Sequence, residues 1–99
     1  MKSKSELKFK QDRVLGDRDE DWDDPILKAK DETLGFLLGD MDSIVMDIET
    51  PPTNNSEIDA MIVSVKKEYE NLPEFSVFGD PNWKVRDTMI EMLEWAKGY

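Results

Sequence analysis

Apolar residues recur at steps of three and four positions through most of the chain from residue 25 onward. This spacing places them on one face of an α-helix and the intervening polar residues on the other. We expect three amphipathic helices, over residues 25–49, 56–72 and 81–97. Their apolar faces comprise Leu34, Leu37, Leu38, Met41, Ile44, Val45 and Ile48; Ile58, Met61, Ile62, Val65, Tyr69 and Leu72; and Val85, Met89, Met92, Leu93 and Ala96, widened by Trp83, Ile90 and Trp95. The pattern predicts a mainly α fold, a small antiparallel bundle of three to four helices.

Capping residues mark where these helices begin. Asp24-Pro25 and Asp80-Pro81 each join an N-cap residue to a proline, which the first helical turn tolerates. Ser56 and Asp59 have the spacing of a capping box, with aspartate in place of the usual glutamate. We therefore expect the second helix to start at residue 56.

Helix-breaking residues mark the other ends. Thr50-Pro51-Pro52 ends the first helix, because the residue before a proline is pushed out of the helical region, and Gly98 lies where a C-cap belongs. Gly35 and Gly39 each weaken the middle of the first helix by about 1 kcal/mol relative to alanine. The pattern thus favours one helix over 25–49, with room for a break or kink near Gly39.

The first 24 residues differ from the rest and are expected to form a charged N-terminal arm beside a single helical domain of residues 25–99. The apolar residues of this arm are compatible with a strand, a fourth helix or a docked extended segment; they are Leu7, Phe9, Val14 and Leu15. Residues 1–13 carry five lysines and arginines against two acids, a net +3, and residues 14–24 carry one arginine against six acids, a net −5. We expect the basic stretch to fold back onto the acidic body.

Composition restricts the class of function. The chain has 99 residues, of which 38% are hydrophobic and 36% charged, with a net charge of −10. Phosphate backbones and anionic lipids repel such a protein, so we expect no direct nucleic-acid or membrane partner. Apolar stretches such as residues 36–38 are far too short to span a bilayer, and cysteine is absent. Because no apolar run follows the basic N-terminus, we expect no secretory signal. The expected location is the cytoplasm.

Catalysis and metal binding find little support in the sequence. Histidine and cysteine, the commonest proton shuttle and the best neutral-pH nucleophile, are both absent. Counting an EF-hand loop from Asp17 puts Trp22 where glycine is needed and Lys28 where a bidentate glutamate is needed. Glu91 and Glu94 have the E-x-x-E spacing of all-helical nucleotide pyrophosphatases, but we interpret them as a solvated helix face. We expect no enzyme activity, cofactor or metal site.

The densest charge surrounds one tryptophan, in the run GDRDEDWDDP at residues 16–25. Carboxylates steer association with a basic surface, and an aromatic side chain can anchor it. This pattern is typical of small proteins that neutralise a basic enzyme, such as immunity proteins, antitoxins and phage-encoded inhibitors of toxins or nucleases. The predicted partner-binding residues are Asp17, Asp19, Glu20, Asp21, Trp22, Asp23, Asp40, Asp42 and Asp47.

Two alternatives stay open. The acidic run could be a solvated linker, with Trp22 packed against the first helix and the acids favouring the positive end of its dipole. The chain could also be a non-catalytic subunit or adaptor that forms an oligomer, including a homo-oligomer, through an apolar helix face.

Overall fold

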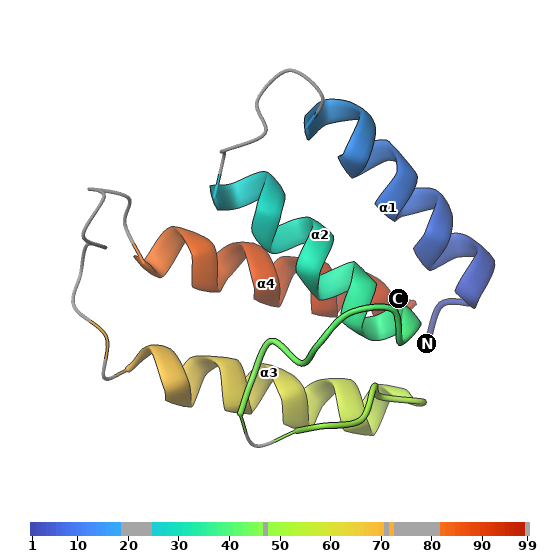
Figure 1. Cartoon of the computed structure of the whole chain (residues 1–99). Coiled ribbons are helices and arrows are strands. Elements are labelled where there is room, and N and C mark those ends of the chain that lie inside the picture. Colours follow the sequence, from blue (N-terminus) through green and yellow to red (C-terminus); the bar gives the residue numbers. More distant parts are fainter. Residues whose placement is uncertain (19–24, 47, 71, 73–81, 99) are drawn as a thin grey trace.

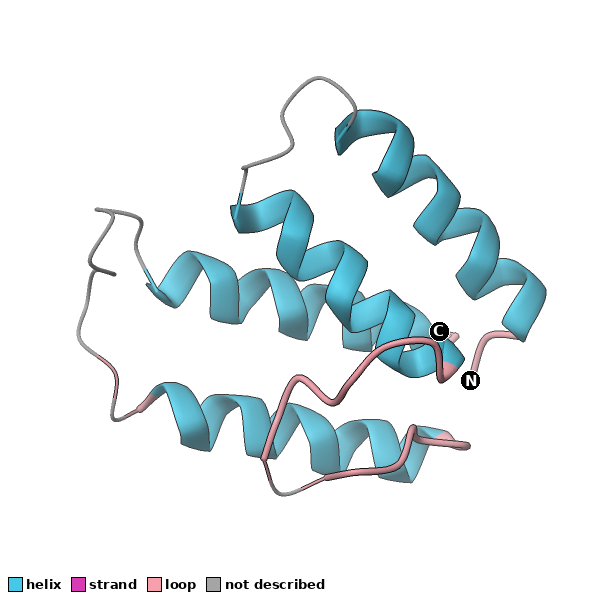
Figure 2. Ribbon diagram, viewed as in Figure 1, coloured by secondary structure: helices cyan, strands magenta, loops and turns pink. Residues whose placement is uncertain are grey.

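Four helices make up the fold, shown in Figure 1 and, coloured by secondary structure, in Figure 2. The computed structural model describes residues 1–18, 25–46, 48–70, 72 and 82–98. The helices are α1 (Lys4–Arg18), α2 (Pro25–Leu38), α3 (Asn55–Tyr69) and α4 (Asn82–Ala96). Consecutive helices run in opposite directions, and α2 packs against both α1 and α4, while α3 packs against α4 (Figure 1). The predicted small, mainly α bundle is confirmed.

A single core joins all four helices. It is formed by Leu7, Val14, Ala29, Leu34, Phe36, Leu37, Val45, Ile58, Met61, Ile62, Val65, Met89, Met92, Leu93 and Ala96. The predicted apolar faces of α3 and α4 supply most of it, because residues three and four positions apart in these helices point to the same side. Trp83 and Leu72, assigned to those faces, are instead about half exposed, at 48% and 47%.

The basic stretch near the N-terminus is helical. Of the three conformations open to it, residues Lys4–Arg18 adopt a helix, and Leu7 and Val14 bury against α2 while Phe9 stays 66% exposed. Ser3 caps this helix, because its hydroxyl accepts a hydrogen bond from the Glu6 backbone N–H at 3.2 Å. Residues 19–24 lie outside the described part of the chain.

The prediction of one helix over residues 25–49 is wrong, because α2 ends at Leu38, but the break that the sequence allowed near Gly39 is confirmed. Gly39 adopts the left-handed conformation, with φ at +81°, and its N–H donates to the Phe36 carbonyl at 2.9 Å. The Asp40 N–H donates to the Gly35 carbonyl at 2.9 Å. These two bonds form a Schellman motif, which satisfies carbonyls at the helix end and turns the chain away from the axis.

Residues 39–46 and 48–54, which we call the crossing segment, therefore run as irregular chain between α2 and α3 (Figure 2). Met41 lies directly over Gly35 of α2, and the Met46 N–H donates to the carboxylate of Glu68 on α3 at 3.2 Å. Val45 is 4% exposed and enters the core, whereas Met46 is 87% exposed. The apolar residues predicted for one long helix face thus divide between α2 and an irregular segment that bridges α2 and α3.

The start of α3 also differs from the prediction. Asn54, not Ser56, is the N-cap, and its side-chain oxygen accepts from the Glu57 N–H at 2.9 Å. The Glu57 carboxylate in turn accepts at 3.1 Å from the N–H of Thr53, the residue before the N-cap, so the pair resembles a capping box shifted by one donor. Asn54 and Glu57 have the same three-residue spacing as the predicted pair, Ser56 and Asp59, and they use the longer glutamate side chain that the motif favours.

The two ends of the chain lie side by side (Figure 1). The Lys2 N–H donates to the Ala96 carbonyl at 2.8 Å, and the ammonium groups of Lys2 and Lys10 lie 5.0 and 5.4 Å from the centre of the Trp95 ring. Gly98, with φ at +84°, takes the predicted C-cap position beyond α4. Cation–π contacts and one backbone hydrogen bond therefore connect the N-terminal stretch to α4.

Replacing Gly35 by alanine tests the contact that seats the crossing segment. The new Cβ would lie 2.6 Å from the Met41 Cγ, so Met41 must move. We expect G35A to lower the free energy of unfolding by about 1 kcal/mol, because this displacement outweighs the gain in helix propensity. In an M41G background, which also removes the Met41 Cβ at 3.2 Å, the same change is expected to raise it by up to about 1 kcal/mol. Urea denaturation of the four chains measures both values.

Gly16 supplies the matched control. It lies in a different helix, α1, and a Cβ added there would meet no atom within 4 Å. We expect G16A to raise the free energy of unfolding by up to about 1 kcal/mol whether Met41 is present or not. A G35A effect of the same sign in both backgrounds would show that Met41 does not rest on Gly35.

The cap of α3 is tested by N54A, which removes the oxygen that accepts the Glu57 N–H. We expect it to lower the free energy of unfolding by about 1 kcal/mol, and S56A, at the residue the sequence pattern favoured, to change it by less than about 0.5 kcal/mol. Thermal denaturation of both variants decides between the two registers, and the reverse ranking would contradict the observed cap.

Candidate functional site

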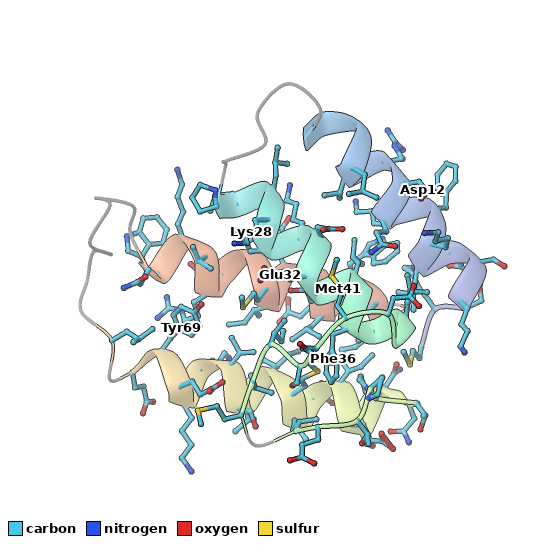
Figure 3. The ribbon with its side chains drawn as sticks, in the orientation of Figure 1. Asp12, Lys28, Glu32, Phe36, Met41 and Tyr69 are labelled. Carbon is cyan, nitrogen blue, oxygen red and sulfur yellow. The ribbon has the colours of Figure 1, made fainter. Side chains whose placement is uncertain are left out.

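An open acidic groove of about 810 Å³ lies between α2 and the first residues of the crossing segment. Its lining residues are Lys28, Asp31, Glu32, Gly39, Asp40, Met41, Asp42, Ser43 and Ile44. Figure 3 shows Lys28, Glu32 and Met41 on the same side of the molecule. The groove therefore combines four carboxylates and one lysine with two apolar side chains.

The wall on α2 follows from helical spacing. Lys28 and Glu32 are four residues apart, so they lie one turn from each other, and their charged groups approach to 4.0 Å. Asp31 stands beside Glu32 on the same helix and is only 4% exposed. A regular helix thus holds one side of the groove.

Asp31 is anchored from the neighbouring helix. The side-chain amide of Gln11 on α1, itself 4% exposed, donates to the Asp31 carboxylate at 3.4 Å. Lys8 donates in turn to the Gln11 side-chain oxygen at 3.3 Å. Buried polar groups that keep their hydrogen-bond partners specify a fixed arrangement. The hydrogen bonds from Lys8 to Gln11 and from Gln11 to Asp31 therefore position α1 against the groove wall.

The opposite wall comes from the turn after α2. Asp40 and Asp42 are both exposed, and no cation in the described part of the chain forms an ion pair with either. They follow the C-terminal end of α2, where the helix dipole is negative and carboxylates are disfavoured. Folding stability therefore does not account for acids at these two positions.

Ser43 shapes the outer part of this wall. Its hydroxyl accepts from the Val45 N–H at 3.2 Å and lies 2.7 Å from the Val45 carbonyl, with the Ile48 carbonyl also in hydrogen-bond reach. These bonds curl the chain just after Asp42, so the Ser43 side chain holds the turn by bonding to its backbone. Ile44 is half-buried beside them and contributes an apolar surface to the groove.

Glu32 also influences Tyr69 of α3. Partial burial raises the pKa of the Tyr69 hydroxyl above its ordinary value of 10.0, and the nearby carboxylates of Glu68 and Glu32 raise it further. The Tyr69 hydroxyl lies 3.9 Å from the Met89 sulfur of α4. The carboxylate of Glu32, which lines the groove, therefore acts electrostatically on a side chain of α3.

The structure places the predicted partner-binding residues in different ways. Asp40 and Asp42 come together at the groove, and Asp17 lies in the last turn of α1. The remaining predicted residues lie outside the described part of the chain; they are Asp19, Glu20, Asp21, Trp22, Asp23 and Asp47.

The contribution of α2 to the groove was not predicted from the sequence. Asp31 and Glu32 were not selected, because a helix continuing to residue 49 leaves no turn for them to face. The available signal was the four-residue spacing of Lys28 and Glu32 in the helix that ends just before Gly39, the residue at which the chain reverses.

Other chemistry is not assembled within the described residues. No group of three or more acidic side chains there has an arrangement that could hold a metal ion, and Glu91 and Glu94 are exposed on α4. None of the described helices combines the length and apolar character needed to cross a bilayer.

No protein-family model, curated protein or solved structure has significant similarity to the chain. The assignment of a candidate site therefore depends on the geometry and charge of the groove alone.

The titration of Tyr69 reports on the position of Glu32. We expect E32Q to bring the pKa of Tyr69 closer to 10.0, because one of the carboxylates that disfavour the phenolate is removed while partial burial still holds it above that value. The neutral hydroxyl stabilises the fold fully below pH 10.0, and this contribution is lost as pH rises through the higher folded-state pKa. Phenolate absorbance against pH measures the shift.

Two controls make this titration specific. Y69F identifies the signal of Tyr69, since Tyr99 is the other tyrosine of the chain. E91Q removes an exposed carboxylate from α4 and is expected to leave the Tyr69 titration unchanged. An unchanged titration in E32Q would mean that Glu32 does not act on Tyr69.

Proposed function

We propose that this chain is a small acidic protein that binds a basic enzyme, such as a toxin or nuclease, and neutralises it by occupying its cationic surface. The role is that of an immunity protein, antitoxin or phage-encoded inhibitor, and it requires no catalysis by the chain itself. The observation that carries the proposal is the acidic groove, where Asp40 and Asp42 are exposed without an ion pair to any described cation.

Charge supports binding to a cationic macromolecule. The net charge of −10 on 99 residues attracts basic surfaces over long range and raises the rate of encounter. Enzymes that act on nucleic acids carry basic grooves that bind phosphates, and an array of carboxylates can occupy such a groove in place of phosphate. The acids of the groove therefore supply orientation and speed of association.

The make-up of the groove supports specific binding as well. Its α2 wall is held by helix geometry and by the buried Gln11–Asp31 hydrogen bond, so binding a partner does not require that wall to become ordered. Met41 and Ile44 offer apolar contact to the methylene stem of a lysine or arginine whose charged end meets Glu32 or Asp42. A rigid wall with both kinds of contact suits a protruding basic side chain.

The acidic run around Trp22 belongs to the same proposal. It connects the C-terminal end of α1 to the first residue of α2, Pro25, and we propose that Asp17, Asp19, Glu20, Asp21, Trp22 and Asp23 add contacts to the basic partner, as does Asp47. Binding is proposed to take place in the cytoplasm, where a chain that has no cysteine needs no oxidising environment.

Neutralising the groove tests the proposal. Partners captured at low and at high salt are identified first, and each is assayed for inhibition by the chain. We expect E32Q/D40N/D42N to slow association with the captured basic enzyme by about tenfold at low salt and to weaken inhibition, because electrostatic steering is lost. Stopped-flow association kinetics measure the rate.

A matched variant separates the groove from net charge. E70Q/E91Q/E94Q removes the same number of negative charges from exposed positions outside the groove. We expect it to reduce the association rate much less. Equal effects of the two triple variants, or capture of partners that are not basic, would contradict the proposal.

A further inference from the structure

A second hollow adjoins the acidic groove. It has a volume of about 660 Å³, and its lining residues are Lys4, Ser5, Lys8, Phe9, Asp12, Leu38 and Asp40. Asp40 lines both hollows, so they form one continuous surface with Asp40 at the boundary. We call the second one the α1 hollow, because most of its residues come from α1.

The α1 hollow differs from the groove in charge, because Lys4 and Lys8 balance Asp12 and Asp40 in its lining. Its acid Asp12 is held by Lys8 of the same helix at 3.6 Å, whereas Lys4 is exposed and has no ion pair to a described acid. Phe9 is 66% exposed, and the guanidinium of Arg13 lies over its ring at 6.0 Å. Apart from this contact with Arg13, most of the Phe9 side chain is open to solvent, so it can serve as an apolar anchor.

The acidic groove offers the groups that this hollow lacks. The carboxylates of Glu32 and Asp42 are opposite in charge to Lys4 and Lys8. Met41, which is 40% exposed, can form a sulfur–aromatic contact with the Phe9 ring. Both sets belong to the same chain but lie on either side of Asp40, so they cannot meet within one molecule.

We propose that a second copy of this chain occupies the surface and forms a two-fold symmetric dimer. In a two-fold dimer the same patch is used twice, so each half of the patch meets the other half on the second copy. A patch with one acidic half and one half that carries two lysines satisfies this requirement when the axis passes between the two hollows. Lys4 and Lys8 of one copy then face Glu32 and Asp42 of the other, and Phe9 covers Met41.

The dimer is held by local contacts against a general repulsion. Each chain carries a net charge of −10, which opposes association at long range, and salt at about 0.15 M screens this repulsion beyond about 8 Å. Self-association stands apart from the proposed capture of a basic enzyme, although the two compete for the acidic groove. A dimer would therefore protect the groove until a tighter basic partner displaces the second copy.

The test exchanges the charges of the two halves. One variant, K4E/K8E, makes both halves acidic, and another, E32K/D42K, makes both halves basic. We expect each variant alone to dimerise at least about tenfold more weakly than the natural chain, and an equimolar mixture to form a heterodimer of restored affinity, because acid then meets base at both contacts. Sedimentation equilibrium over a roughly hundredfold range of protein concentration measures the four dissociation constants, those of the natural chain, of each variant alone and of the heterodimer.

Two further variants separate this contact from general effects. K66E/K67E changes net charge as much as K4E/K8E does, on exposed positions of α3 outside both hollows, and is expected to weaken the dimer by less than about threefold. F9A keeps every charge and is expected to weaken it by about tenfold. Thermal denaturation confirms that each chain is folded. A natural chain that stays monomeric at about 1 mM, a mixture that does not recover, or equal effects of K66E/K67E and K4E/K8E overturns the proposal.

Discussion

The reversal of the chain after α2 is the constraint on which the rest of the structure depends. Gly39 adopts a positive φ that other residues rarely tolerate, and the Schellman bonds to Phe36 and Gly35 close the helix there. Met41 then settles over the one α2 position where the absence of a Cβ leaves room, at Gly35. Two glycines four residues apart thus set both the end of the helix and the path of the segment that follows.

Both the core and the groove follow from this reversal. The crossing segment delivers Val45 to the core and bonds to Glu68 of α3, so it bridges two helices that stand on either side of it. The same turn carries Asp40 and Asp42 back toward Asp31 and Glu32, which gathers four carboxylates into about 810 Å³. Had α2 continued, these acids would have been distributed along one side of a longer helix.

The charges of this protein serve two different purposes. Several acids have local structural roles: Glu57 caps α3, Asp12 pairs with Lys8 at 3.6 Å, and Asp59 pairs with Lys97 at 2.6 Å. Asp40 and Asp42 of the groove have no such role, because they follow the negative, C-terminal end of α2. Such placement costs stability and favours an external partner, as both the proposed basic enzyme and the proposed second copy require.

The sequence by itself determined the fold class and much of the helix content. The spacing of Ile58, Met61, Ile62 and Val65 predicted α3, that of Met89, Met92, Leu93 and Ala96 predicted α4 to within a residue at each end, and Gly98 marked its cap. Such local signals suffice because a helix is defined by bonds between residues four apart. The sequence also selected Asp40 and Asp42 as candidates from their charge alone.

Tertiary structure decided where α2 ends, which other carboxylates lie near Asp40 and Asp42, and how far the Phe9 side chain is exposed. A helical period and a folded-back segment can bury the same apolar residues, and only the packing of Met41 on Gly35, with the closure at Gly39, selects between them.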